Sequence, residues 1–260
     1  MRIFLINLAR APERRQNMAR QFSSAGLAFE SAEAIDGRQL TDADRRLVDH
    51  ERRRRITPYP LSDNEIGCWL SHRRVLQKIA DDNIPMAAVV EDDAVLAPDL
   101  SGVLAAIEKQ APVFDFIFLH RKMKTGEIFV PTMELVPGLR LGRVGPAHMG
   151  AIAYVVSSRG AKRFLAYAPR FVHAVDKEIH RYWANGLEIY GLERPAAGHD
   201  DGGHSFIEET RGQESPACRP RYAGADNFYW RLMRFVTRLS DSVRKRRAWS
   251  ALIGAGKKVS

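Results

Sequence analysis

The feature that most limits the fold of this chain is a short apolar run that ends in three acids. Residues 86–90 carry no polar side chain, and Glu91, Asp92 and Asp93 follow them directly. A strand this apolar is typical of a parallel sheet that helices cover on both faces. Because ligands of such sheets bind beyond the carboxyl ends of the strands, we expect the three carboxylates to border a site.

The segments around this run alternate between strand and helix patterns. Strands are predicted at residues 2–8, 28–35, 114–119 and 151–156, and helices at 12–25, 63–82, 99–110 and 158–168. The pairs Thr41/Asp44 and Ser62/Glu65 have the spacing of a capping box, which predicts helix starts there, the first helix reaching residue 50. The alternation indicates an α/β fold with a mostly parallel central sheet flanked by helices.

Other segments lack these patterns. Residues 51–60 contain four consecutive arginines and two prolines, so we expect a solvated loop there. Residues 125–145 are rich in turn residues and predict short strands or loops, whereas residues 198–203 and 213–221 predict loops.

Composition excludes several classes of protein. Hydrophobic residues make up 45% of the chain, which is enough for a packed core. No apolar stretch approaches the roughly 18 residues of a membrane span, and the N-terminal run has no small-residue cleavage site of a secretory signal. Cys68 and Cys218 lie far apart without a metal-ligand spacing, which favours a reduced, cytoplasmic location. The net charge of +9 favours polyanionic partners without choosing among them.

The acidic triplet is the sharpest local signal of chemistry. Adjacent carboxylates repel one another unless a cation neutralises them, and oxygen ligands of this kind suit Mg2+ or Mn2+. The plainer alternative is an exposed acidic turn before Pro98. The buried strand in front of the triplet favours a metal site.

Basic residues follow the first predicted strand. Asn7, Arg10 and Arg14 could reach phosphates or a base, since Arg10 and Arg14 are four residues apart. Taken alone, an ordinary basic first turn explains them equally well.

Three further sets of residues each have two interpretations. His72 lies on the capped helix, four residues after Cys68, where a hydrogen-bonded core histidine is the commoner role. Asp176 follows an apolar segment and could cap a helix or act as a general base. For the group His199, Asp200, Asp201 and His204, a solvated loop is favoured over a metal site, because the spacing fits no standard pattern.

In order and spacing, these segments resemble glycosyltransferase family 25, which includes bacterial lipooligosaccharide glycosyltransferases and collagen galactosyltransferases. The similarity runs over residues 1–207. It rests on INLARAPERR (6–15), AIDG (34–37), EIGCWLSH (65–72), VVEDDAVL (89–96), GAIAYVVSSRGAKRFL (150–165), AVD (174–176) and HSFI (204–207). Ala9 and Ala11 stand where the family often has Asp or Arg.

The resemblance implies a GT-A-type fold over residues 1–207, with residues 208–260 as a basic C-terminal extension. It implies an inverting transferase that moves a sugar, galactose in the typical case, from a UDP-sugar donor to a saccharide or glycolipid acceptor of lipooligosaccharide or another surface glycan. Mn2+ or Mg2+ would be held by Glu91, Asp92 and Asp93, and Asp176 would be the catalytic base. The implied nucleotide-sugar contacts are Asn7, Arg10, Arg14, Asp36, Gly37, His72, Glu91 and Asp92.

Two alternatives belong to other classes of protein. The basic runs at residues 52–55 and 244–247 could indicate a nucleic-acid-binding protein, but the sequence contains no recognisable binding module, so no nucleic acid is expected. A metal-dependent phosphohydrolase would use the same acids without an acceptor.

The C-terminal segment carries a helical pattern of its own. Apolar residues recur at steps of three and four within residues 226–249, and basic residues surround them. Such a helix could lie on an anionic membrane surface, peripheral to the inner face of the cytoplasmic membrane. Packing of the same stripe on the core or on a second subunit is nearly as well supported.

Overall fold

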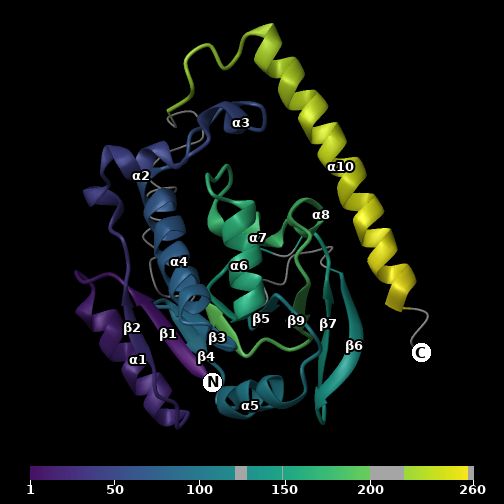
Figure 1. The fold of residues 1–260 in the computed structure, drawn as a ribbon. Helices are drawn as coiled ribbons and strands as arrows, with labels where there is room; N and C mark the ends of the chain where they lie inside the picture. Colours follow the sequence, from purple (N-terminus) through teal and green to yellow (C-terminus); the bar gives the residue numbers. More distant parts are fainter. Residues whose placement is uncertain (121–127, 148, 200–219, 257–260) are drawn as a thin grey trace.

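An eight-stranded mixed sheet lies at the centre of the computed structural model, which describes residues 1–120, 128–147, 149–199 and 220–256 (Figure 1). The strand order is β2-β1-β3-β8-β5-β9-β7-β6, and β10 pairs with β4 separately. The strands are β1 (Arg2–Asn7), β2 (Glu30–Glu33), β3 (Met86–Glu91), β4 (Ala94–Leu96), β5 (Phe116–Phe118), β6 (Phe129–Val136), β7 (Leu139–Val144), β8 (Ala153–Ser157), β9 (Ile189–Leu192) and β10 (Ala197–His199).

Helices connect these strands and cover both faces of the sheet. They are α1 (Pro12–Ser24), the 3-10 turn η1 (Gly37–Gln39), α2 (Asp42–Arg46), α3 (His50–Arg54), α4 (Asp63–Asp81), α5 (Leu100–Gln110), α6 (Ser158–Tyr167), α7 (Val175–His180), α8 (Tyr182–Asn185) and α10 (Phe228–Gly256). The α/β class is therefore confirmed, as are the strands and helices expected before residue 170, with small changes at their ends except at the helix expected to reach residue 50.

The prediction of a mostly parallel sheet is wrong. β1 pairs in parallel with both β2 and β3, and β5 with β9, but the other four pairings in the sheet are antiparallel. β8 lies antiparallel between β3 and β5. A strand buried on both faces is apolar whichever way it runs, so the sequence pattern could not reveal this direction.

The sheet separates two hydrophobic cores. Along β1, Phe4 and Ile6 belong to the core beneath α4, α6 and α7, whereas Ile3 and Leu5 belong to the core beneath α1 and α5. Alternate residues of a strand point to opposite faces, so one short strand supplies both cores. This explains why β1 and β3 read as continuous apolar runs.

Helix starts follow the local signals in the sequence. Ser62 and Glu65 form the expected capping box at α4, and Thr41 and Asp44 form one at α2. α2 nevertheless ends at Arg46 and does not reach residue 50. The chain then turns into a β-bridge between Val48 and Phe171, a contact 123 residues away that no local pattern shows.

The arginine run at residues 52–55 does not form the solvated loop expected there. Its first part belongs to α3, whose N-terminus is capped by the Asp49 side chain. The Arg53 guanidinium donates to the carbonyl oxygens of Tyr59, Pro60 and Val172. This arginine therefore joins two distant segments, which sequence composition alone does not reveal.

The C-terminal helix is longer than expected. α10 runs beside α8 along one side of the molecule (Figure 1) and extends to Gly256. Across the described ranges, the helices are too short or too polar to cross a membrane. His199 belongs to β10, so the expected loop at residues 198–203 is wrong for its described part. The remainder of that loop, most of residues 213–221, the HSFI segment and the expected boundary after residue 207 lie outside the described residues.

Candidate functional site

Three parallel strands end at one edge of the sheet. Asn7 at the end of β1 is aligned with Glu33 of β2, and Ile6 is aligned with Glu91 at the end of β3. The chain reaches β2 by way of α1 and reaches β3 by way of α4, on opposite faces of the sheet. The strand order therefore reverses at β1, and such a switch point is where open α/β sheets bind ligands.

A cavity that opens to solvent lies at this switch point. Apolar residues and charged residues both contribute to its walls. It is lined by Ile6, Leu8, Arg10, Arg14, Ala34, Ile35, Asp36, Gly37, Asn64, Cys68, Ser71, His72, Glu91, Asp92 and Asp93. The structure therefore brings together the residues expected to contact the nucleotide sugar, with Asn7 directly behind them.

α4 supplies one wall of the cavity. Asn64, Cys68, Ser71 and His72 are separated by the three- and four-residue steps that place side chains on one helix face. The capping box at the start of α4 fixes where this face begins. No sequence pattern indicated a function for Asn64 or Ser71, because both residues are common on helix surfaces.

Two glycines allow the segment after β2 to lie against α4. A Cβ atom on Gly67 would stand 2.6 Å from the carbonyl oxygen of Ile35, and one on Gly37 would stand 2.6 Å from Asn64 Oδ1. The Ser71 hydroxyl accepts a hydrogen bond from the Ile35 amide at 2.8 Å. Gly37 thus belongs to the site as expected, and the reason for a glycine there is close backbone packing.

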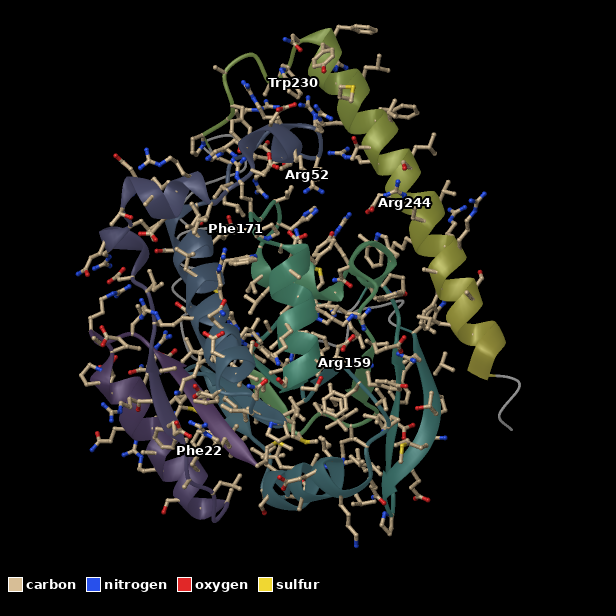
Figure 2. All side chains as sticks on the ribbon, in the orientation of Figure 1. Phe22, Arg52, Arg159, Phe171, Trp230 and Arg244 are labelled. Atoms are coloured by element: carbon tan, nitrogen blue, oxygen red, sulfur yellow. The ribbon has the colours of Figure 1, made fainter. Side chains whose placement is uncertain are left out.

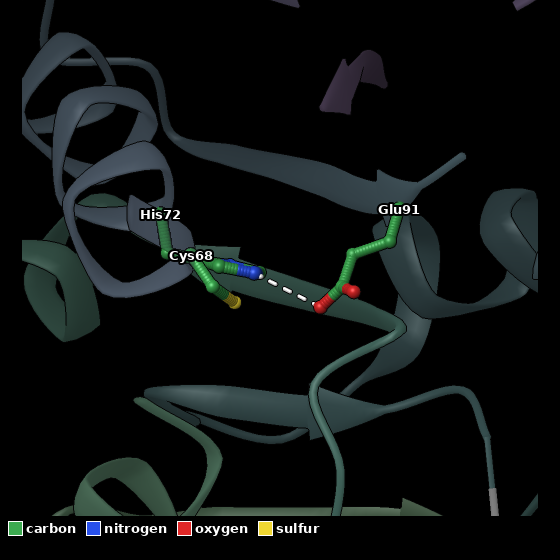
Figure 3. A group of neighbouring side chains, drawn as sticks. All are labelled: Cys68, His72 and Glu91. Atoms are coloured by element: carbon green, nitrogen blue, oxygen red, sulfur yellow. Dashed lines mark hydrogen bonds and ion pairs between the residues drawn. The ribbon is translucent and has the colours of Figure 1, made fainter. Parts of the chain in front are cut away.

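Glu91 is held by a buried histidine. His72 is fully buried, and its Nε2 lies 3.0 Å from Glu91 Oε1 while its Nδ1 lies 2.9 Å from the Tyr154 hydroxyl (Figure 3). Burial opposes ionisation of Glu91, but the hydrogen bond and the charge of His72 bring its pKa below the ordinary value. The expectation of a hydrogen-bonded core histidine is confirmed, and the same residue lines the cavity.

Tyr154 was missed by the sequence analysis. It lies within the apolar strand β8 and is fully buried. A hydroxyl in such a strand needs a partner when buried, and that requirement is the signal that could have indicated a polar contact beneath the site.

Asp92 is held by residues of the first strand and helix. Asn7 Nδ2 donates to Asp92 Oδ2 at 2.6 Å, and Arg14 Nη1 donates to Asp92 Oδ1 at 3.2 Å. Burial raises the pKa of Asp92 despite these two contacts. Arg10 makes a separate ion pair with Asp36 at 2.8 Å, so both arginines lie at the cavity beside carboxylates.

Asp93 differs from its two neighbours. Burial, together with the negative charges of Glu91 and Asp92, raises its pKa to about 7. Its Oδ1 atom is buried and has no hydrogen-bond partner within the part of the chain that the structure describes. A buried oxygen without a donor, next to two other carboxylates, fits a divalent cation that prefers oxygen ligands.

A second possible set of metal ligands lies on the α4 side. Ligand atoms of Cys68, His72 and Glu91 lie within 4.8 Å of one another, and the three side chains point toward a common centre in Figure 3. Burial and nearby carboxylates raise the pKa of the Cys68 thiol well above its ordinary value, which disfavours the thiolate in the metal-free protein. Both ring nitrogens of His72 are already hydrogen-bonded. The acidic triplet is therefore the better fit for Mn2+ or Mg2+.

Asp176 is not a helix cap. The N-cap of α7 is Ala174, which makes Asp176 the second residue of the helix. Its Oδ2 accepts a hydrogen bond from the Gly150 amide at 3.3 Å, and its charge contributes to the raised pKa of Cys68 in the cavity wall. The capping interpretation is wrong, whereas the interpretation as a general base stays a prediction.

His199 also approaches the site. It pairs with Ala94 across β10 and β4, just after the triplet, and its charge lowers the pKa of Glu91. Its possible metal partners Asp200, Asp201 and His204 lie outside the described residues.

Comparison with known proteins decides the family. A profile described as glycosyltransferase family 25 (LPS biosynthesis protein) matches residues 1–179, which includes the whole cavity and Asp176. The chain belongs to glycosyltransferase family 25.

Curated members of family 25 from animals match the same region. Procollagen galactosyltransferase 1-A of Xenopus laevis is 30% identical over 181 residues, covering 64% of this chain and 28% of the relative. A glycosyltransferase 25 family member of Drosophila melanogaster is 32% identical over 184 residues, covering 65% and 28%. A probable inactive family member 3 of Bos taurus is 28% identical, covering 64% and 29%. The chain thus matches less than a third of the length of these family 25 relatives.

One solved structure resembles the fold only distantly. A mutant Drosophila beta-1,4-galactosyltransferase 7, in complex with manganese, UDP-Gal and xylobiose, is 12% identical to this family 25 chain. It covers 86% of this chain and 82% of its own, with a TM-score of 0.37, which is too low to establish a common fold.

Proposed function

We propose that this chain is an inverting glycosyltransferase that moves galactose from UDP-galactose to a saccharide acceptor, with Mn2+ or Mg2+ at the acidic triplet. The observation that carries the proposal is Asp93, a half-buried carboxylate at the wall of the switch-point cavity, whose buried Oδ1 has no hydrogen-bond partner among the described residues. Family membership supports the reaction class, and the name of the relative from Xenopus laevis supports the sugar.

The residues that line the cavity suit both parts of a nucleotide diphosphate. Ile6, Leu8 and Ile35 offer an apolar surface for a base, whereas Arg10 and Arg14 offer guanidinium groups for phosphates. Asn7 and Arg14 orient Asp92, and His72 orients Glu91. The carboxylates are thus held in place before any ligand arrives.

Glu91, Asp92 and Asp93 would hold the cation. When bound, a divalent cation would neutralise negative charge on the diphosphate leaving group. Arg14 would add positive charge on the same side, because its guanidinium already lies against Asp92 at the cavity wall.

The acceptor hydroxyl must lose its proton as it attacks. In an inverting transfer, its oxygen forms a bond to the anomeric carbon while the bond from that carbon to the phosphate oxygen breaks, and UDP leaves with the electron pair. We assign the proton to the Asp176 carboxylate. The support is its half-buried position, held by the Gly150 amide, at a distance where its charge acts on Cys68.

The finer fold type and the acceptor belong to the same proposal. The parallel unit β2-β1-β3, with its site at the strand ends, is compatible with a GT-A-type domain. The family description as an LPS biosynthesis protein supports a saccharide of lipooligosaccharide or another surface glycan as acceptor.

Thermal unfolding with UDP-galactose tests the proposal. UDP-galactose with Mn2+ should raise the melting temperature more than either ligand alone, since a ligand that binds only the folded state stabilises it. UDP release should then depend on added saccharide acceptor, which separates a transferase from a phosphohydrolase. An unchanged melting temperature with both ligands present at millimolar concentration would refute the donor site.

A further inference from the structure

α10 presents an apolar ridge to solvent. Phe228 is 81% exposed and Phe235 is 65% exposed. The full apolar ridge consists of Phe228, Leu232, Phe235, Val236, Leu239 and Val243, which recur at steps of one, three and four residues. All its members are at least 41% exposed. Soluble proteins seldom leave a continuous apolar surface of this kind uncovered without a use for it.

The opposite side of α10 faces the protein, through polar contacts along most of its length and through Ala248, Ala251 and Leu252 near its end. Asp241 accepts hydrogen bonds from both terminal nitrogens of Arg181 at 2.9 Å and from the Trp183 indole at 2.9 Å. Arg234 is buried and donates to the carbonyl oxygen of Ala225. Trp230 lies on the side of α10 toward α3 (Figure 2), where Arg54 covers its ring at 5.0 Å.

The orientation of α10 is therefore the reverse of that of an ordinary amphipathic surface helix. Such a helix directs its apolar stripe inward and its charged residues to water. Here Asp241 anchors the helix through Arg181 and Trp183, and the apolar ridge is exposed to solvent.

Positive charge surrounds the apolar ridge. Exposed basic residues stand on its flanks and at its end: Arg231, Arg238, Arg244, Arg246 and Arg247. Arg246 follows Phe228 by 18 residues, or five helical turns, and so continues the line of the ridge. Asp241 is the single acidic residue of α10, and it is already paired with Arg181.

We infer that α10 docks this protein onto an anionic lipid surface. The helix would lie in the interface, with the apolar ridge at the acyl boundary and the flanking arginines at the headgroup phosphates. A symmetric second copy fits less well, because the ridges could meet only if the flanking arginines came together. Nucleic acid fits less well, because phosphates would leave the ridge exposed to water.

Vesicle flotation of the full-length chain tests the inference without measuring transfer, so its outcome is separate from that of the proposed function. The protein should float with phosphatidylcholine vesicles that contain 30% phosphatidylglycerol and remain at the bottom with phosphatidylcholine alone. Each basic residue near an anionic surface contributes roughly a fivefold gain in partitioning. Arg244→Gln/Arg246→Gln/Arg247→Gln should therefore lower the partition coefficient about 100-fold, and added salt should have the same direction of effect.

A matched pair of variants isolates the apolar ridge. Phe235→Ser/Leu239→Ser should abolish flotation, whereas Val113→Ser/Ile128→Ser should float like the wild type. Val113 and Ile128 are exposed apolar residues outside α10, at 73% and 47%. Equal flotation of the two double variants would overturn the inference, as would equal flotation with and without phosphatidylglycerol.

Light scattering of the lipid-free protein tests whether a second copy of the chain covers the apolar ridge. A wild-type dimer that Phe235→Ser/Leu239→Ser converts to a monomer, together with no flotation of the wild type, would assign the ridge to a second copy and overturn the lipid assignment. A monomer that floats with anionic vesicles supports the inference. Unchanged melting temperatures of the variants confirm that they fold.

Discussion

Asp93→Asn should make the metal-free protein more stable while removing its response to metal. The carboxyl has a pKa of about 7 in place of 3.8, because burial and two neighbouring carboxylates oppose its charge. At pH 8 the ionised group costs the folded state about 4 kcal/mol, and partial exposure reduces this to about 3 kcal/mol. An asparagine removes this cost but leaves polar atoms in the same place, which offsets about 1 kcal/mol of the benefit.

The net expectation is a gain of about 2 kcal/mol, or a rise in melting temperature of about 5 °C in EDTA. The gain should shrink at pH 5. Because the pKa of this carboxyl is raised in the folded state, the free energy of unfolding falls as the pH rises from 3.8 to about 7. At pH 5 only part of that loss has occurred. With Mn2+ the order should reverse, because only the wild type gains stability from the cation.

Asp36→Asn is the matched control, since Asp36 lines the same cavity but has a lowered pKa and an ion pair with Arg10. Its substitution should lower the melting temperature in EDTA. The assay is thermal unfolding of the three proteins at pH 8 and pH 5, with EDTA or with Mn2+. If Asp93→Asn melts below the wild type in EDTA, or gains as much as the wild type from Mn2+, the reasoning about the triplet is refuted.

Three further predictions concern other parts of the chain. Asp176→Asn should lower kcat at least about 100-fold with little change in the donor KM; full turnover at a lower melting temperature would make Asp176 a structural residue. Gly67→Ala should lower stability by roughly 1–3 kcal/mol and weaken UDP binding in calorimetry, whereas Gly102→Ala, which meets no atom within 4 Å, should raise stability by up to about 1 kcal/mol. Burial and nearby basic groups lower the pKa of His173 to about 3. As the pH falls below 6.5, His173 becomes protonated in the unfolded chain but not in the folded chain. The free energy of unfolding from urea titrations should therefore drop by about 1 kcal/mol between pH 7 and 5.5. The drop should be smaller in His173→Gln.

Much of the fold follows from short-range signals. The apolar run before Glu91 becomes β3, and the two capping boxes start α2 and α4 where expected. The errors come from contacts between distant segments. The antiparallel placement of β8, the hydrogen bond from Arg53 to Val172 and the bridge that ends α2 all involve partners more than about 60 residues away, which local periodicity does not encode.

The candidate site was predictable for a related reason. Asn7 and Asp92 are 85 residues apart, yet each directly follows or ends a strand of one parallel unit, so the sheet brings them within 2.6 Å. Tyr154 and Asp176 were harder to interpret. The partner of the Tyr154 hydroxyl is His72 on α4, 82 residues away, and the cap position of α7 is taken by Ala174.

The central position of β8 also affects how the chain folds during its synthesis. Translation delivers β1, β2 and β3 first, but β3 gains its second neighbour only when Ala153–Ser157 has been synthesised. At 5–20 residues per second, the ribosome needs roughly 3 to 13 seconds to add the intervening chain. During that interval a strand that is apolar from Met86 to Val90 has an open edge, which is a template for pairing with another nascent chain. Any truncation that ends before Ala153 makes the exposure permanent, so shortened forms of this protein should be recovered as aggregates.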